Sequence, residues 1–419
     1  MGFALSLSGL NGAARAIDVI GNNIANSETV GFKSSKARFA DVLAASLPGD
    51  LPTVQVGSGV STAIVRQQMT EGTLSVSDNP LDMAITGLGF FRLNTGGEIT
   101  YSRDGQFRLV YDAATPNKLL LVNRTGANVT GYPASYSTDP LGTIDTTALP
   151  QNVAIDTTMP GAATTTVALS ANLDSRDVAP VVPFSAGNPQ SYNATTAATV
   201  YDGTGATHDL RMYFVRSAPG NLWQMYSTMD GGAASGPVAL SFDTAGKMQT
   251  AMPLAGQTYT LGGGGSLTLA LDFSGMVQYG QLFSVDAMTQ DGYGVGSIDS
   301  ASGFSVGADG IIQGQYTNGQ VRRVGQIVLA NFVNPDSLIN IGDGQWTENL
   351  DPVSGSGKVT LSVPGGAGLG ALQGGAVEQS NVDLSTELVA LIEQQRNYQA
   401  SAQTFKILDQ VLQDLANIR

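Results

Sequence analysis

The chain has 419 residues, no cysteine and a formal net charge of −14, so disulfides, thiolate metal sites and cysteine nucleophiles are excluded. The negative charge disfavours nucleic acid as a partner, because its phosphates would be repelled. Only 13% of the residues are charged and 52 are glycine, and Thr, Val, Ala and Ser dominate the long middle, a composition that indicates a mainly β protein with many turns.

Neither a secretory signal nor a membrane span is predicted. The N-terminal segment lacks the basic residues with which a signal peptide begins, and polar residues and glycines interrupt its apolar run. No segment reaches the roughly 18 uninterrupted apolar residues of a membrane-spanning helix. We therefore expect no membrane insertion, and export would use a route without a cleaved signal peptide.

The chain is predicted to start with a helix that has two apolar rows. The first row keeps an alternating four- and three-residue spacing, and the opposite stripe is polar. This row is Phe3, Leu7, Leu10, Ala14, Ile17, Gly21 and Ile24. A second row of mostly small residues lies beside it and consists of Leu5, Gly9, Ala13, Ala16 and Ile20. A helix that is apolar on two sides needs more than one neighbour, which favours oligomeric packing over a simple hairpin of two helices.

A motif of turn-forming residues ends this helix, because Asn26 and Gly31 do not continue it. The motif consists of Asn22, Asn23, Asn26, Thr29, Gly31, Phe32 and Lys33. It closely resembles the amino-terminal motif of the rod and hook proteins of the bacterial flagellum. The segment from Ser380 to Leu388, followed by Gln395 to Ala400, resembles the carboxy-terminal motif of the same family.

The next part of the chain alternates between short strands and turns. Residues 72–107 resemble the first β domain of the family, and a hairpin with Asp104 and Gly105 at its bend is predicted there. Residues 285–363 resemble the returning half of the same domain and contain a predicted hairpin around Asn318 and Gly319.

A Thr-, Ala- and Gly-rich insertion separates these two halves. Its sequence segments at residues 200–202, 208–215 and 271–276 resemble the outer domain of the hook members of the family. Rod members are shorter and generally lack this insertion, so the resemblance favours a hook protein over a rod protein.

A glycine-rich strap at residues 365–375 leads into a long C-terminal helix. Asp383 is its predicted N-cap, and neither Gly nor Pro interrupts the run to Arg419. The predicted packing stripe is Leu384, Leu388, Leu391, Gln395, Tyr398, Ala402 and Phe405, continuing after a shift of register through Leu408, Leu412 and Leu415. A helix with one narrow apolar stripe needs a partner, and the N-terminal helix is the expected one.

The predicted fold is mainly β with α-helical termini that pair as a coiled coil, and its domains are discontinuous and nested. Residues 1–70 with 366–419 are expected to form a helical terminal domain with a connector, the inner tube of an assembly. Residues 71–146 with 284–365 are expected to form a β-rich middle domain, and residues 147–283 a β-rich outer domain.

No catalytic, cofactor or metal site is predicted. His208 is the only histidine and lies beside Asp209 among polar strand residues, so a surface or cross-strand role is favoured over catalysis. The spacing of the Asp-Gly pairs fits hairpin turns better than calcium loops, and Gly262 to Gly265 lacks the lysine of a P-loop. No carboxylate pair is marked for glycoside hydrolysis.

The resemblance implies a structural subunit that polymerises into a curved, flexible tube carrying motor torque to the filament. It implies other copies, the rod, the hook–filament junction proteins, the hook cap and the export apparatus as partners, and an extracellular location in the flagellum. The amide-rich helix faces fit either simple solvation, or hydrogen bonds between subunits and the lining of a channel. The alternatives are a distal rod protein enlarged by an insertion, and an exported β-rich adhesin or carbohydrate-active protein whose end helices clasp it shut.

Overall fold

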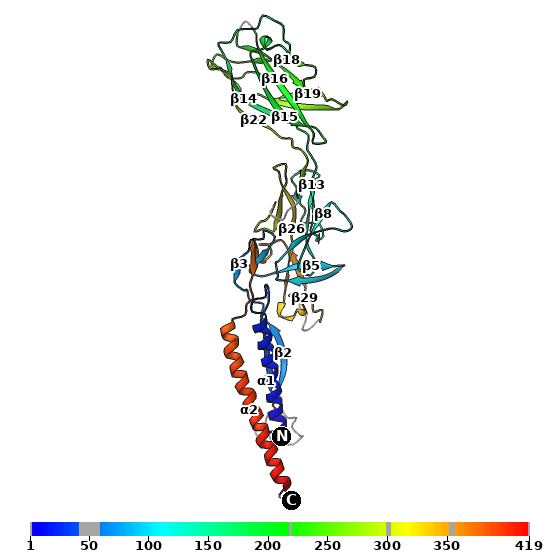
Figure 1. Cartoon of the computed structure of the whole chain (residues 1–419), viewed down its shortest axis with the longest axis vertical. Coiled ribbons are helices and arrows are strands. Elements are labelled where there is room, and N and C mark those ends of the chain that lie inside the picture. Colours follow the sequence, from blue (N-terminus) through cyan, green and yellow to red (C-terminus); the bar gives the residue numbers. More distant parts are fainter. Residues whose placement is uncertain (1, 42–58, 218–219, 299–302, 352–356, 418–419) are drawn as a thin grey trace. The chain divides into compact units, whose positions relative to one another are not determined.

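The computed structural model describes residues 2–41, 59–217, 220–298, 303–351 and 357–417. These residues fall into two compact units. Unit 1 comprises Met1–Thr157, Asp299–Gln315 and Val321–Arg419, and unit 2 comprises Thr158–Ile298 and Tyr316–Gln320. The chain is mainly β, with one helix near each end and the two helices packed together, which confirms the predicted fold class (Figure 1).

Unit 1 contains both long helices and the strands that the two halves of the chain build together. Its helices are α1 (Gly2–Ala25) and α2 (Leu384–Asn417), and the 3-10 turn η4 spans Pro335–Ser337. Its strands are β1 (Ser35–Asp41), β2 (Val60–Gln67), β3 (Leu74–Val76), β4 (Met83–Thr86), β5 (Phe90–Thr95), β6 (Glu98–Ser102), β7 (Arg108–Tyr111), β8 (Lys118–Val122), β9 (Asn128–Ser135), β10 (Thr143–Ile144), β11 (Gln151–Asn152), β12 (Ala154–Asp156), β24 (Phe304–Val306), β25 (Ile311–Gln315), β26 (Val321–Ile327), β27 (Leu329–Phe332), β28 (Ile339–Gly342), β29 (Gln345–Thr347), β30 (Val359–Ser362), β31 (Ala371–Gly374) and β32 (Ala376–Glu378).

The returning half of the chain closes unit 1. β27 pairs with β5, β29 with β6, β31 with β4 and β32 with β3, all antiparallel. An aromatic cluster fills the space between them, with the ring of Phe90 5.8 Å from the rings of both Phe332 and Trp346. Strands from both halves are therefore needed to bury this core.

One of the two predicted hairpins is confirmed and the other is wrong. β25 and β26 form an antiparallel hairpin around Asn318 and Gly319, whose φ of 80° suits glycine. Asp104 and Gly105 instead follow β6, which pairs with β5 and β29 and not with the next strand. Glycine is required at position 105 for steric reasons, because a Cβ at this position would lie 1.6 Å from the carbonyl oxygen of Met83.

Two large sheets of unit 2 enclose one core, and β13 and β23 form a small sheet of their own. Its elements are β13 (Thr158–Met159), β14 (Thr166–Asp174), η2 (Pro189–Ser191), β15 (Ala194–Tyr201), β16 (Thr207–Ser217), β17 (Leu222–Met229), β18 (Ser235–Ser241), β19 (Leu254–Thr260), β20 (Ser266–Asp272), β21 (Val277–Tyr279), β22 (Ser284–Gln290) and β23 (Gly296–Ser297). β15 to β18 form a four-stranded sheet in chain order, and β19, β20, β14, β21 and β22 form a five-stranded one.

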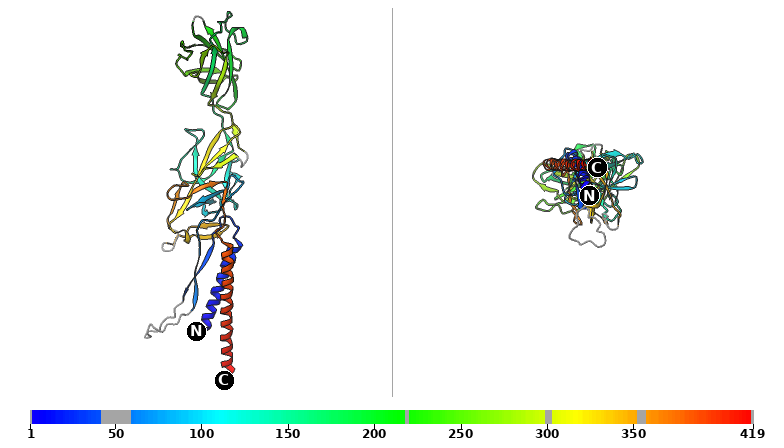
Figure 2. Two further views of the ribbon diagram at one scale, coloured as in Figure 1. Left: turned by 90° about the vertical axis from the view of Figure 1, so that its left-hand side faces the viewer. Right: turned by 90° about the horizontal axis from the view of Figure 1, so that it is seen from below.

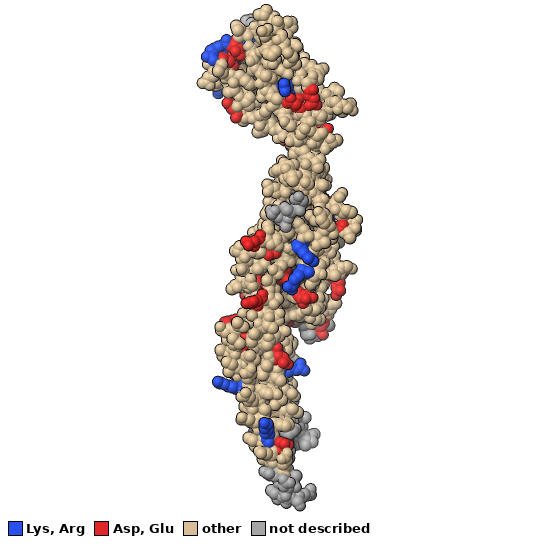
Figure 3. All heavy atoms as spheres, viewed as in Figure 1, with Lys and Arg blue, Asp and Glu red and all other residues tan. Residues whose placement is uncertain are grey.

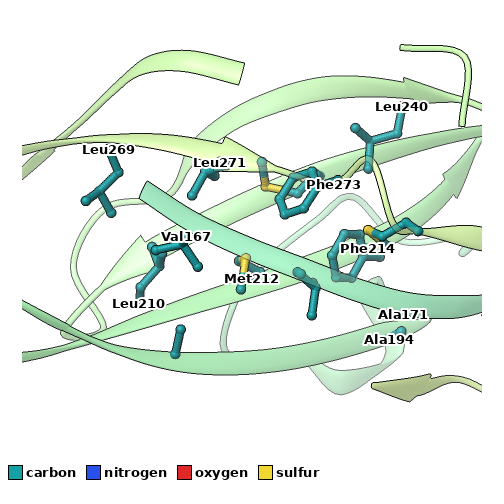
Figure 4. Packing of buried hydrophobic residues seen from close by; sticks show 14 of the residues in the cluster. Val167, Ala171, Ala194, Leu210, Met212, Phe214, Leu240, Leu269, Leu271 and Phe273 are labelled. Carbon is teal, nitrogen blue, oxygen red and sulfur yellow. The ribbon is translucent and has the colours of Figure 1, made fainter. Parts of the chain in front are cut away.

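Alternate side chains of the two sheets make the core of unit 2. Val167, Leu210 and Leu271 belong to three different strands and are fully buried in one cluster (Figure 4). Period-two alternation is what places one face of each strand in such a core. In the part of the chain that the structure describes, no helix is long and apolar enough to cross a membrane.

Candidate assembly interface

The two terminal helices lie side by side and contact through the row of small residues on α1 (Figure 2). Ala13, Ala16 and Ile20 are buried, and a Cβ added to Gly9 would lie 3.2 Å from Ser401 Oγ on α2. Gly12 faces the ribbon of β1 and β2, where its Cβ would come 3.3 Å from Val60 Cγ2. Small side chains let these backbones approach closely.

The larger apolar row of α1 is only partly covered. Leu7 is 42% exposed and Gly21 is exposed. Leu10, Ala14, Ile17 and Ile24 are only half-buried, and the side chain of Phe3 lies outside the described residues. Of the two rows, the small one packs within the chain from Gly9 to Ile20, although Leu5 at its start is 47% exposed, and the larger row keeps part of its surface available.

α2 also keeps much of its apolar surface exposed. In the predicted stripe, Leu384, Leu388, Gln395 and Tyr398 are exposed, Leu391, Ala402, Phe405 and Leu408 are half-buried, and the side chains of Leu412 and Leu415 lie outside the described residues. The edge that contacts α1 and the ribbon is shifted from this stripe toward Gln394 and Ser401. Val389 and Ile392, at 67% and 52% exposure, add to the uncovered surface.

Asn23 ties the end of α1 to its neighbours. Its side chain is fully buried, and its amide nitrogen donates to the carbonyl of Ser35 at 2.8 Å while its amide oxygen accepts from the N–H of Ser35 at 2.9 Å. The same nitrogen donates to Glu387 Oε1 on α2 at 3.1 Å. One amide thus joins α1, β1 and α2.

The other motif residues shape the turn after α1. Asn26 Nδ2 donates to the carbonyl of Asn22 at 2.9 Å, and Thr29 Oγ1 donates to Asn26 Oδ1 at 3.2 Å. Asn22 is exposed and Phe32 is half-buried. These contacts close the turn and stop the helix.

Gly31 is the point where this turn meets the C-terminal segment. Its N–H donates to the carbonyl of Glu378 at 2.7 Å, and its φ of 71° lies in the left-handed region. A Cβ at this position would lie 2.5 Å from the backbone nitrogen of Asp104. Both the conformation and the space therefore require glycine.

A buried charge cluster lies next to Gly31. The Lys33 ammonium contacts Glu378 Oε1 at 2.5 Å and donates to the carbonyl of Thr70 at 2.7 Å, and Arg103 Nη1 contacts Glu378 Oε2 at 3.1 Å. All three side chains are at most 3% exposed. Burial lowers the pKa values of Lys33 and Arg103 from their ordinary values, and the Glu378 carboxylate opposes that shift in both.

Arg103 completes the cluster on the side of the β strands. Its Nη2 donates to the carbonyl of Gly87 at 2.7 Å, and its guanidinium lies 5.3 Å from the ring centroid of Phe90. Glu378 also accepts the N–H of Gly72 at 2.8 Å. One carboxylate from β32 thus holds a lysine from the N-terminal motif, an arginine after β6 and a backbone amide before β3.

Asn381 and Asp383 continue this junction into α2. Asn381 accepts the N–H of Ser34 at 2.7 Å and donates to the carbonyl of Gln68 at 2.8 Å. Asp383 accepts the N–H groups of Ser385 and Thr386 at 2.9 and 3.2 Å, which confirms the predicted N-cap, and these bonds lower its pKa.

Sequence reasoning did not single out Glu378 or Arg103. The available signal for Glu378 was weak, namely one charged residue after the apolar pair Ala376 and Val377. Its partners Arg103 and Lys33 lie 275 and 345 residues away in the sequence, so no local pattern connects them.

Both halves of this junction match family models. Residues 5–33 match the flagella basal body rod protein model, and residues 373–418 match the flagellar basal body rod FlgEFG protein C-terminal model. Within unit 2, residues 172–293 match the flagellar basal body protein FlaE D2 domain. The flagellar hook protein FlgE of Escherichia coli K12 is 42% identical over 427 residues, covering 100% of each chain.

The chain belongs to the flagellar hook protein family. The flagellar hook protein FlgE of Salmonella typhimurium is 41% identical, again over 100% of both chains. A solved structure, that of Helicobacter pylori flagellar hook protein FlgE2, is similar to 71% of this chain and to 99% of that chain, with 16% identity and a TM-score of 0.47.

Family membership confirms the resemblance to hook members that the insertion indicated. The hook protein family is a structural one, and it belongs to the flagellum and its basal body. An adhesin or a carbohydrate-active protein is therefore no longer a competing assignment for the chain as a whole.

Proposed function

We propose that this chain polymerises through its terminal helices into the tube of the flagellar hook. The observation that carries the proposal is the apolar surface that one chain leaves uncovered on both helices. Leu7 on α1 and Leu388, Val389 and Ile392 on α2 are all more than 40% exposed. Covering such residues in neighbouring copies is favourable by about 25 cal/mol for each Å² of apolar surface buried.

The junction around Glu378 is proposed to transmit torque from the helices to the β strands. Asn23, Gly31 and Lys33 connect the end of α1 to segments far along the chain, through hydrogen bonds to Glu387 and to the carbonyl of Glu378 and through the buried ion pair with Glu378. Buried hydrogen bonds and ion pairs of this kind hold their side chains in place. Torque applied to the helix pair would therefore reach the β strands of unit 1 with little deformation of the junction around Glu378.

The surface chemistry supports a bendable tube. Figure 3 shows one face on which charged side chains are few and scattered. Surfaces without dense ion-pair networks slide or switch contacts at small cost, which a curved rotating tube requires. Along α2, the exposed amides of Gln395, Gln399 and Gln403 are proposed to hydrogen-bond between copies or to line the channel without holding a passing chain.

The remaining partners follow from this role. The tube would join the rod at one end and the hook–filament junction proteins at the other, and the hook cap and the export apparatus would act during assembly. We propose export without a cleaved signal peptide to an extracellular position. The proposed layers are an inner tube of residues 1–70 and 366–419, a middle layer of 71–146 and 284–365, and an outer layer of 147–283.

Deletion of residues 411–419 tests the proposal. The full chain should form tubes above a threshold concentration, seen by electron microscopy, and the shortened chain should stay monomeric with unchanged β-sheet circular dichroism. A double substitution in the kept part of α2, Leu388→Asp with Ile392→Asp, should have the same effect, while Glu393→Gln between them should not. A shortened chain that still forms tubes would contradict the proposal.

A further inference from the structure

The ribbon formed by β1 and β2 has one basic face. In its antiparallel register Lys36 lies directly opposite Arg66, and Arg38 lies opposite Ile64. Directly opposed residues, and residues two apart on one strand, point to the same side of a sheet. The register shifts by one residue between Arg38 and Phe39, so Val60 points to the opposite side of the ribbon from Arg66. Phe39 and Val60 both contact α1 at Gly12. The three cations therefore lie on the side of the ribbon away from the helix.

These cations are poorly compensated within the chain. Like charges directly opposite each other destabilise a strand pair. Arg66 is 3.9 Å from the Asp336 carboxylate, but both side chains are more than 40% exposed, so this pair is weak. Lys36 and Arg38 are exposed, and among the described residues no carboxylate lies within 4.0 Å of either.

A hollow of about 400 Å³ lies beside the basic face. It is lined by the three cations together with Gln68 and Thr70 of the connecting segment and with Pro335 and Asp336 of η4. It opens to solvent and combines positive charge with the side-chain amides of Gln67 and Gln68. Such a surface suits the side-chain carboxylates of an approaching protein.

We propose that this basic face binds a carboxylate-bearing surface of a second copy of the chain. The chain itself supplies the complementary charge, because it has 34 acidic and only 20 basic residues. The inference rests on the proposed polymerisation, since helices that share their apolar faces would bring neighbouring copies against the ribbon. Opposite charges across an interface mainly select partner and register, and they add modest affinity.

The test compares the critical concentration for tube formation in the full chain and in the double variant Lys36→Ala with Arg38→Ala. The control is Arg108→Ala, which removes an exposed cation from β7 in the same unit. At about 50 mM salt we expect a critical concentration about fivefold higher for the double variant and an unchanged one for the control. At about 500 mM salt the difference should shrink, because screening weakens exposed ion pairs.

Three results separate the inference from the proposed function. A full chain that forms no tubes at any salt concentration would refute the polymerisation itself. Tubes with the same critical concentration in the full chain and the double variant would refute only the basic interface. An equal loss at both salt concentrations would also refute it, because that pattern indicates altered packing and not charge. Far-UV circular dichroism of each variant checks that the ribbon substitutions leave the fold intact.

Discussion

Lys33 and Glu378 lie 345 residues apart in the sequence, and their fully buried side chains meet at 2.5 Å. The pair joins the motif after α1 to the last strand before α2. Arg103 shares the same carboxylate. This ion pair therefore joins the segment after α1 to the segment before α2, and Arg103 connects both to the β strands of unit 1.

Glu378→Gln should destabilise unit 1 by about 3–5 kcal/mol, because it leaves two buried cations without a counter-charge. The two tryptophans allow a direct measurement, since Trp346 is buried in unit 1 and Trp223 in unit 2. In a Trp223→Phe background, urea unfolding followed by the fluorescence of Trp346 reports unit 1 alone. Glu98→Gln, at an exposed position on β6, is the control. A change of less than about 1 kcal/mol for Glu378→Gln would show that the cluster is not holding this unit together.

Gly31→Ala and Gly21→Ala should have effects of opposite sign. At position 31 the left-handed φ and the backbone of Asp104 both oppose a Cβ, so we expect a loss of about 2 kcal/mol or more. At position 21 on α1 a Cβ meets nothing within 4 Å, so alanine should stabilise the helix by about 0.5–1 kcal/mol. The same fluorescence assay on the monomer compares them. Equal effects of the two substitutions would mean that the turn can relax around the new methyl group.

Local patterns predicted the parts of unit 1 that depend on neighbours in sequence. The N-cap at Asp383 and the turn at Gly31 follow from residue types that suit those backbone positions. Spacing could not tell which of the two rows on α1 packs against α2, because both rows have helical periodicity. The small row contacts it because residues such as Gly9 and Ala13 permit a closer approach.

Contacts between distant segments were not predictable from the sequence. Glu378 acts as the shared counter-charge of Lys33 and Arg103, and only folding brings these three residues together. At Gly105 a local pattern gave a wrong prediction for the same reason, namely a contact with a distant segment. Its Asp-Gly dipeptide is typical of a hairpin bend, yet the glycine serves the close passage of the Met83 carbonyl.

Unit 2 should lose stability as the pH rises above about 6.5, the value for an unperturbed histidine. His208 Nδ1 lies 2.7 Å from Asp230 Oδ2 and its Nε2 lies 3.6 Å from Asp202 Oδ2. The hydrogen bond with Asp230, followed by the contact with Asp202, raises the pKa of His208 in the folded chain. The stabilisation is therefore complete below the pKa of the unfolded chain and is lost as the pH rises through the folded value.

Because His208 is the only histidine, its Hε1 ring proton gives a single histidine Hε1 signal in the NMR spectrum, and the titration of that signal measures this pKa directly. Unfolding of unit 2 can be followed by the fluorescence of Trp223 in a Trp346→Phe background. His208→Gln should remove the part of the pH dependence that lies above about pH 6.5. A His208 pKa at or below that of a model peptide would refute the prediction.

The terminal helices should be the least protected elements of a dilute monomer. α2 has no buried residue among its described side chains, whereas β5 and β16 are rich in fully buried ones. Regions with few buried contacts open at low free energy. The buried residues of α1 are covered largely by α2 and the ribbon, so α1 loses this cover when α2 opens. Amides of both helices should therefore exchange with solvent well before those of β5 and β16. Hydrogen exchange on the same protein after tube formation should show strong protection of both helices, because neighbouring copies then cover Leu7, Leu388 and Ile392. The strands give an internal control, since their exchange should change little. Helices that are already as protected as β16 in the monomer would mean that one chain satisfies them alone, and the reason for copies to share them would be lost.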